Sequence, residues 1–405
     1  MAEARARPRA ALTSYTSSMS PRSRLLIALT STCLIAYIAL GTLLGRVFGD
    51  TTYGQLAIFN EVIRIVVEAY VEPVNLDRAM AGADLGLTEA LDGDSSYLSA
   101  DEYKAFQQSD KQGDADVGAV LTRRFGFLMV VALRPGSPAE KAGLRTGDIL
   151  KTIDGKHSRP LAVVTGERLL RGAPGSVVKL RVLRAGSDPL EMSVVRERLQ
   201  PAEPERKLLA DGTGYLKLRE FHQKTADAVR GEVEVLKKSG AKKLVLDLRG
   251  AGWGAPLEGV KVAELFMKGG VVTKLSGRKV AEQVMSADQT RTLWELPLAV
   301  LIDTGTAGPG EVVAGALLDA GRATLVGERT FGRAGFQKAV PLPEGALLIT
   351  VAKYFTPKGN AIHGRGIVPS VPVQVPDDAP SSGEPGDQIL EKALEVLKGE
   401  VKKAA

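Results

Sequence analysis

The sequence predicts a multidomain α+β protein with an N-terminal transmembrane helix, a helical segment, a strand-rich domain and a mixed α/β core. Three observations support this prediction. An uncharged apolar run fills residues 25–45. Strand-like alternation with frequent turn signals fills residues 113–199. Short branched apolar runs, each followed by a helical pattern, recur in residues 207–375, as expected for buried strands in an α/β sheet.

The composition is that of a globular protein without disulfides or a cysteine-built metal site. The 405 residues are 44% hydrophobic and 25% charged, which suits about two or three domains. Arginines near the N-terminus contribute to the net charge of +6, and no nucleic-acid motif accompanies it, so we expect no nucleic-acid partner. Cys33 is the only cysteine. The histidines are few and widely separated (His157, His222 and His363), so we expect no metal and no cofactor.

The N-terminal segment carries a localisation signal. Residues 25–45 are about as long as the ~20 residues that span a bilayer as a helix. Basic residues precede the run, which predicts that residues 1–24 form a cytoplasmic tail; they are Arg5, Arg7, Arg9, Arg22 and Arg24. We expect a single-pass inner-membrane protein with the bulk of the chain on the periplasmic side. A cleaved signal peptide and a buried soluble helix are the alternatives.

Residues 51–112 have the pattern of a helical segment. A first amphipathic helix is interrupted near Pro73, and a second helical stretch runs to Leu91 and into a turn at residues 92–98. We expect these helices to pack without contributing chemistry. The apolar face of the first helix comprises Ile58, Val62, Ile63, Ile65, Val66 and Ala69.

Residues 113–199 carry a specific motif within their strand pattern. Residues 134–155 contain R-P-G-S-P-A-E-K-A-G-L, then G-D-I-L and I-D-G, and so resemble a PDZ domain of the circularly permuted kind. Backbone amides at the peptide-binding edge of such a domain would hold a terminal carboxylate while the strand edge accepts a peptide. We expect Arg123 and Arg124, just beyond this edge, to form a solvated face; selection of acidic tails is the alternative. The resemblance places the edge at Val117, Gly118, Ala119 and Val120.

Residues 207–375 form the predicted α/β core, and one strand–turn–helix within it is suited to catalysis. Leu298–Ile302 is an apolar run typical of a buried strand, and a glycine-rich turn follows it. Gly308 suits a helix N-cap, Pro309 suits the first helical position, and Glu311 lies in the first turn, at the positive end of the helix dipole. Such a turn is a good place to hold a nucleophile and to stabilise an oxyanion.

A second buried strand and a C-terminal helix complete the predicted core. Leu244–Arg249 is another branched apolar run. Residues 376–405 read as a linker followed by a helix, with the Pro-, Ser- and Asp-rich linker at residues 376–387 and an amphipathic helix at residues 388–398.

The residues around Gly308 resemble the carboxyl-terminal processing, or tail-specific, serine peptidases, in which a PDZ domain precedes the protease core. The family signature runs S-A-S-x-S-E-I-V-A-G-A-L, then V-G-E-x-T-F-G-K-G-x-x-Q. This chain keeps Glu311 and the residues after it, and Gln337. The resemblance implies a serine nucleophile at Gly308 and a lysine general base at Arg333. Glycine has no side chain, and arginine does not lose its proton near neutral pH, so both positions of the catalytic dyad are replaced.

A third departure falls on the turn after Leu244–Arg249. The family sequence there is L-D-L-R-x-N-P-G-G, and its glycine turn helps to form the oxyanion hole. We expect the tryptophan in this chain to crowd that hole. The altered turn contains Gly252, Trp253 and Gly254.

Two classes of function follow. The first is a membrane-anchored pseudopeptidase that binds protein C-termini, unstructured polypeptides or an active homologous peptidase; the helix dipole and Arg333 would attract a carboxylate to its vacated cleft. The alternative is an active serine-type endopeptidase with a displaced nucleophile such as Thr306. Because a displacement of about 1 Å can cost on the order of a hundredfold in rate, we expect no catalysis. Phosphate binding by the glycine-rich turn lacks the required G-K-[ST] ending.

Overall fold

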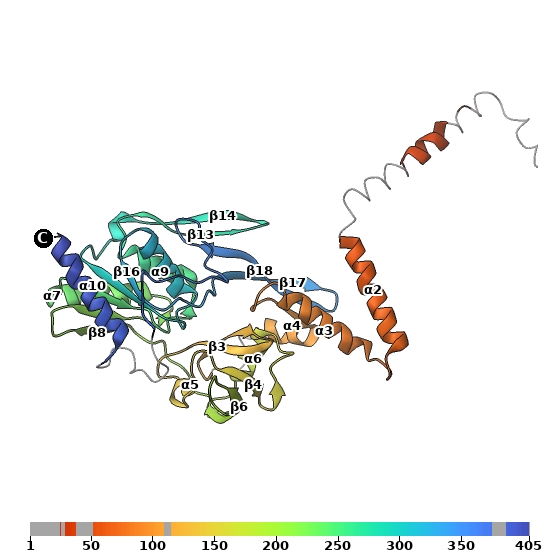
Figure 1. Cartoon of the computed structure of the whole chain (residues 1–405), viewed down its shortest axis with the longest axis horizontal. Helices are drawn as coiled ribbons and strands as arrows, with labels where there is room; N and C mark the ends of the chain where they lie inside the picture. The colour runs from red at the N-terminus through yellow and green to blue at the C-terminus, as the bar shows by residue number, and fades with distance from the viewer. Residues whose placement is uncertain (1–24, 26–28, 38–51, 109–114, 375–385, 405) are drawn as a thin grey trace, which may run out of the picture. The chain divides into compact units, whose positions relative to one another are not determined.

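The computed structural model describes residues 25, 29–37, 52–108, 115–374 and 386–404 (Figure 1). The chain divides into two compact units, residues 1–80 and 81–405. The first unit contains α2 (Thr52–Ala69) and the start of α3 (Leu76–Glu89). The predicted first helix is therefore present, and it ends before Tyr70 as expected.

Most of the predicted transmembrane run lies outside the described residues. Leu25 and residues 29–37 are helical, while the remainder of residues 25–45 and the predicted cytoplasmic tail, residues 1–24, are not described. Across the described ranges, no helix combines the length and the apolar character needed to cross a bilayer.

Within the second unit, the strand-rich domain is a sheet of order β2-β3-β4-β6-β7, with β5 paired to β4. Its edge strand β2 pairs antiparallel with β3. In β6, Val178, Leu180 and Val182 are buried and alternate with more exposed residues, because successive side chains of a strand point to opposite faces. The elements are β2 (Ala119–Arg124), β3 (Phe127–Leu133), α5 (Pro138–Lys141), β4 (Ile149–Ile153), β5 (Lys156–His157), α6 (Val163–Leu170), β6 (Val177–Leu183) and β7 (Leu190–Val195).

The core is built on a sheet of order β19-β16-β15-β11-β9-β8, parallel except for its edge strand β8. Its strands are β8 (Glu205–Leu208), β9 (Gly214–Lys217), β11 (Leu244–Asp247), β15 (Leu298–Ile302), β16 (Thr324–Gly327) and β19 (Val371–Pro372). Four helices pack with it: α7 (Thr225–Lys238), α8 (Pro256–Glu264), α9 (Pro309–Asp319) and α10 (Gln388–Ala404).

Helices cover both faces of this sheet. Leu244 and Leu246 of β11 belong to the apolar cluster that contains residues of α7, α8 and α9. Val245, between them, belongs to a second cluster with Ile389 and Ala393 of α10. Figure 1 shows α10, at the C-terminus, lying along the sheet near β16. Burial on both faces explains why these strands read as continuous apolar runs.

A third, antiparallel sheet reaches back to the predicted helical segment. Its order is β1-β18-β13-β14, and β17 also pairs with β18. Residues 92–98 were predicted to be a turn, but Ser96–Ser99 forms β1 and pairs with β18. Ser99 then caps α4 (Ala100–Gln107). The remaining elements are β10 (Glu220–Phe221), β12 (Trp253–Gly254), β13 (Gly270–Gly277), β14 (Val280–Ala287), a 3₁₀ turn (Gln289–Arg291), β17 (Gly335–Leu342) and β18 (Gly345–Phe355).

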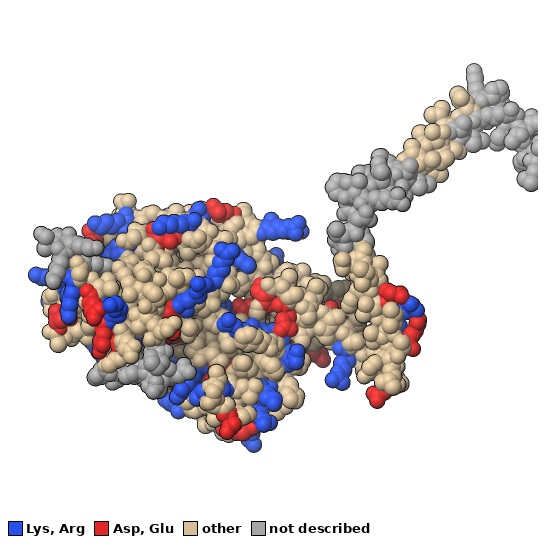
Figure 2. Space-filling view, viewed as in Figure 1, with Lys and Arg blue, Asp and Glu red and all other residues tan. Residues whose placement is uncertain are grey.

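Basic and acidic side chains are interspersed on the face shown in Figure 2. On this face the net charge of +6 is therefore not gathered into one basic surface of the kind that follows a nucleic-acid backbone.

Candidate functional site

The predicted strand, turn and helix are present at the carboxyl edge of the core sheet. β15 ends at Ile302, and α9 begins at Pro309 with Gly308 as its N-cap. Asp303 organises the turn between them: its Oδ1 accepts hydrogen bonds from the backbone N–H groups of Gly250 (2.9 Å) and Gly305 (3.0 Å). Desolvation raises the pKa of this carboxyl group.

Thr306, the alternative nucleophile, is fully buried in this turn. Its Oγ1 lies 2.9 Å from the carbonyl oxygen of Leu248, to which it donates, and it accepts a hydrogen bond from the N–H of Asp303 at 3.0 Å. Because the hydroxyl is engaged on both sides and has no access to a substrate, it serves the turn and is not placed for attack.

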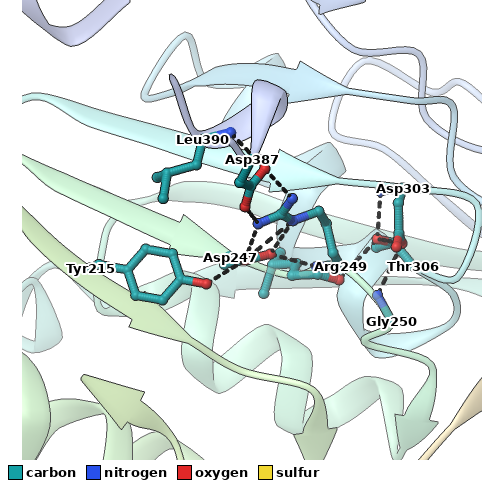
Figure 3. Close-up of polar contacts among 9 residues, drawn as sticks. Tyr215, Asp247, Arg249, Gly250, Asp303, Thr306, Asp387 and Leu390 are labelled. Carbon is teal, nitrogen blue, oxygen red and sulfur yellow. Dashed lines mark hydrogen bonds and ion pairs between the residues drawn. The ribbon is translucent and has the colours of Figure 1, made fainter. Parts of the chain in front are cut away.

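A buried ion-pair network fixes the neighbouring turn after β11 (Figure 3). The guanidinium group of Arg249 lies between the carboxylates of Asp247 (2.6 Å) and Asp387 (2.7 Å). Tyr215 donates to Asp247 from the adjacent strand at 2.6 Å. Desolvation opposes the charge of Arg249, but the two carboxylates raise its pKa overall. Asp387, predicted to belong to a linker, instead anchors the start of α10; residues 376–385 of that predicted linker lie outside the described ranges.

The backbone at Gly308 makes a sharp turn between β15 and α9. Its φ of 51° and ψ of −112° lie in a region that residues other than glycine rarely adopt. A sharp, strained strand-to-helix turn of this kind exposes the catalytic serine in other hydrolases. A Cβ atom added at Gly308 would meet only the carbonyl oxygen of Arg333, at 3.5 Å, so space for a side chain remains.

The amides beside this position are not available to an oxyanion. The N–H of Gly308 donates to Glu311 Oε2 at 3.0 Å. Pro309 has no N–H group, and the N–H of Gly310 donates to Ala307. We expected the helix N-terminus to attract a carboxylate, but its first donors are absent or already used.

Glu311 connects α9 to the loop that carries Arg333 through several hydrogen bonds. Its buried carboxyl group accepts hydrogen bonds from Thr330 Oγ1 (2.5 Å), Gly332 N (2.7 Å) and Arg333 N (2.9 Å), besides Gly308 N. Desolvation raises its pKa to about 7 despite these donors. The sequence predicted only that Glu311 interacts with the helix dipole. Its hydrogen bonds to the loop at residues 330–333 were not predicted, because the local sequence pattern does not position that loop.

Arg333 is held in an ion pair by the segment that we expected to contribute no chemistry. Its Nε lies 2.9 Å from Asp94 Oδ2. Gln337 donates to the carbonyl oxygen of Asp94 at 2.7 Å, and Thr122 Oγ1 donates to Asp94 Oδ1 at 2.9 Å. Asp94, which follows α3, therefore brings the segment that we expected to pack without chemistry into contact with Arg333.

A cavity of about 180 Å³ lies beside Gly308 and Arg333. Gly252, Gly254, Gly308 and Arg333 line it, so the structure brings the predicted site residues together. Trp253 does not line the cavity. It packs in an apolar cluster with Val120, Val131, Ala132, Ala307 and Phe331, and the guanidinium of Arg134 lies 4.9 Å from its ring centroid. The expected crowding of the oxyanion turn by Trp253 is wrong, because the side chain faces the strand-rich domain.

The predicted carboxylate-binding edge, from Val117 to Val120, is buried. The N–H of Gly118 donates to its near neighbour Asp116 Oδ1 at 2.9 Å. Ala119 and Val120 pair with β3. On the open side of β2, Leu121 N lies 3.4 Å from a carboxylate oxygen of Glu167 in α6. The Gly118 amide that we expected to hold a carboxylate is thus occupied by the chain itself.

Among the described residues, no group of three or more His, Cys, Asp or Glu side chains is arranged to hold a metal ion.

Comparisons with known proteins agree with this architecture. Residues 212–373 match the model of peptidase family S41, and residues 129–184 match a PDZ domain model. The carboxy-terminal processing protease CtpA of Bacillus subtilis is 29% identical over 369 residues, covering 87% of this chain and 78% of the relative. A carboxy-terminal-processing protease of Bartonella bacilliformis is 33% identical over 334 residues, covering 81% and 77%. The structure titled photosystem II D1 C-terminal processing protease aligns with a TM-score of 0.65 at 28% identity, covering 82% of this chain and 89% of that one.

Proposed function

The chain belongs to the carboxyl-terminal processing protease family, and from this premise we propose that it is a member that binds polypeptides without cleaving them. The observation that carries the proposal is the glycine at position 308. It occupies the strained turn in which a nucleophile would stand, with open space for a side chain that is not there.

The surroundings of Gly308 support the same proposal. A serine–lysine mechanism requires a neutral lysine to take the proton of the nucleophile. Desolvation opposes the charge of Arg333, but the carboxylates of Asp94 and Glu167 raise its pKa overall, so Arg333 stays protonated and bound to Asp94. Pro309 and the engaged N–H of Gly308 remove donors that would stabilise an oxyanion. Nucleophile, base and oxyanion donors are therefore affected together.

The cavity beside Gly308 and the strand-rich domain next to it support polypeptide binding. Glycines make up much of the lining of the cavity beside Gly308, together with Asp94, Arg333 and Gln337, and their lack of side chains leaves space for a polypeptide backbone. Unstructured polypeptides and protein C-termini are the proposed ligands, and an active homologous peptidase is a further proposed partner.

The test of binding uses the full-length chain and a labelled unstructured polypeptide with an apolar, free C-terminus. Fluorescence anisotropy should report saturable binding, and mass spectrometry of the same sample should recover the polypeptide intact. An amidated version measures how much the terminal carboxylate contributes. Absence of binding to either version would remove the binding function.

We further propose that residues 25–45 anchor the chain in the inner membrane, with residues 46–405 on the periplasmic side. The arginines that precede residue 25 and the length of the apolar run support this orientation. Protease added to spheroplasts should digest the bulk of the chain, whereas complete protection would contradict the proposed topology.

A further inference from the structure

A second cavity, of about 370 Å³, adjoins the first. Asp94 and Arg333 line both cavities, so their ion pair forms part of the wall between them. The second cavity lies between the strand-rich domain and the core. It is also lined by charged or titratable side chains that are not part of the vacated dyad, namely Asp92, Arg123, Arg124, Lys353 and His363.

The two acidic side chains of this cavity are already engaged. Asp92 Oδ1 accepts hydrogen bonds from the N–H groups of Asp94 (3.0 Å) and Ser95 (2.7 Å), and its Oδ2 lies 3.6 Å from His363 Nε2. Desolvation of Asp92 is outweighed by these bonds, and its pKa is held well below the ordinary value. Asp94 is paired with Arg333, as described above.

Three other basic side chains of this cavity, by contrast, form no ion pair within the described residues: Arg123, Arg124 and Lys353. Arg123 is only 4% exposed, yet its guanidinium donates to two backbone carbonyls, those of Arg159 and Leu161, and its Nε has no hydrogen-bond partner. Arg124 and Lys353 are exposed, and within the described part of the chain neither forms an ion pair. His363 Nδ1 is buried without a partner.

Burying a cation without a carboxylate partner costs free energy, and an anion that contacts the cation offsets that cost. The prediction that Arg123 belongs to a solvated face is therefore wrong, because its side chain is buried, whereas Arg124 is exposed as expected. Arginine also suits this role because its planar fork matches the geometry of a carboxylate.

We propose that this cavity binds an acidic side chain of a polypeptide whose neighbouring residues occupy the cavity beside Gly308. The positive charge that attracts the acidic side chain comes from Arg123, Arg124 and Lys353. The Asp94–Arg333 ion pair lies between that side chain and the uncharged polypeptide backbone in the cavity beside Gly308. The inference rests on the proposed binding function and specifies its ligand: an extended polypeptide with an acidic residue. It holds whether or not the chain retains any cleavage activity.

The test compares two labelled peptides that differ only in Glu against Gln at two adjacent positions, each measured by anisotropy with the full-length chain. Two ion pairs at the upper end of the range for exposed pairs predict about thirtyfold tighter binding of the Glu peptide at low salt. Arg124→Gln with Lys353→Gln should abolish that preference. The matched control is Lys156→Gln with Lys179→Gln, which removes the same charge from exposed positions of the strand-rich domain outside the cavity and should retain the preference.

Each outcome decides between explanations. Equal binding of both peptides, or a preference that survives Arg124→Gln with Lys353→Gln, would overturn the acidic-residue inference and leave polypeptide binding intact. Failure of both peptides to bind would remove the binding function itself. Inorganic phosphate and acetate are each tested as competitors of the Glu peptide. If phosphate displaces the peptide at concentrations where acetate has no effect, the cavity is assigned to phosphate instead.

Discussion

Glu311 connects the two residues on which the proposed loss of catalysis rests. Its carboxyl group accepts hydrogen bonds from the N–H groups of both Gly308 and Arg333, so this acidic residue holds both in place. Full burial of this carboxyl group, with its pKa raised to about 7, makes the site sensitive to pH.

The sign of this pH dependence follows from linkage. The unfolded carboxyl group titrates near 4.5 and the folded one near 7, so between these values the folded chain holds a proton that the unfolded chain has lost. The contribution to stability is complete below pH 4.5 and is lost as the pH rises through 7. A shift of this size corresponds to about 3 kcal/mol in the free energy of unfolding.

Urea unfolding at a series of pH values, for wild type and Glu311→Gln, measures this contribution. Glutamine does not titrate, so the stability of wild type relative to the variant should fall by about 3 kcal/mol between pH 4.5 and 8. A difference that stays constant, or that grows with pH, would show that the folded carboxyl group is ionised throughout.

At the scale of elements, α10 is fastened to the core sheet by one charged contact at its start. Asp387 is 6% exposed, and its carboxylate binds Arg249 and accepts the N–H of Leu390. Arg249 follows β11 and precedes the glycine-rich turn at residues 250–254. The helix and the turn are therefore coupled through Arg249 (Figure 3).

Asp387→Asn should lower the free energy of unfolding by about 2 kcal/mol. Breaking a buried ion pair completely costs about 3–5 kcal/mol, and the loss is smaller here because Asp247 still compensates Arg249. Glu395→Gln, which removes an exposed carboxylate from the same helix, is the matched control and should leave the unfolding midpoint unchanged. Equal effects of the two substitutions in urea unfolding would contradict the anchoring role of Asp387.

The elements predicted correctly are those determined by residues that lie close together in the sequence. β15, the glycine N-cap at Gly308 and α9 lie where the apolar runs and capping residues predict them. β1 was missed because its pairing partner, β18, lies far away in the sequence. The ion pair of Asp94 with Arg333 was missed for the same reason, since no local pattern indicates a contact between residues so distant in the chain.

The PDZ domain was predicted correctly, but the expectation of free amides at its carboxylate-binding edge differs from the structure for another physical reason. The pattern at Val117–Val120 correctly indicated a strand edge next to a turn. It could not show that Asp116 and Glu167 would satisfy amides at that edge, because side-chain partners depend on how the strand and α6 pack. The burial of Arg123 was also not predicted, because neighbouring charged residues are generally expected to be solvated.

At the scale of the whole second unit, the strand-rich domain packs against the core next to the candidate site. Val120, Val131 and Ala132 of that domain share an apolar cluster with Ala307 and Trp253 of the core. Arg134 also forms an ion pair with Glu220, at 2.7 Å, where Glu220 is almost fully buried. Both cavities therefore lie beneath or beside a domain that is held to the core by apolar and charged contacts.

The central claim is that this covered site binds without cutting. The most direct measurement incubates the full-length chain with an unstructured protein that ends in apolar residues and follows the products by mass spectrometry. The account predicts an intact substrate with wild type and with Thr306→Ala alike. Gly308→Ser with Arg333→Lys restores at most a trace of cleavage, because Pro309 supplies no amide to the oxyanion. Robust cleavage by wild type that Thr306→Ala abolishes, in a variant that remains folded, would contradict the account.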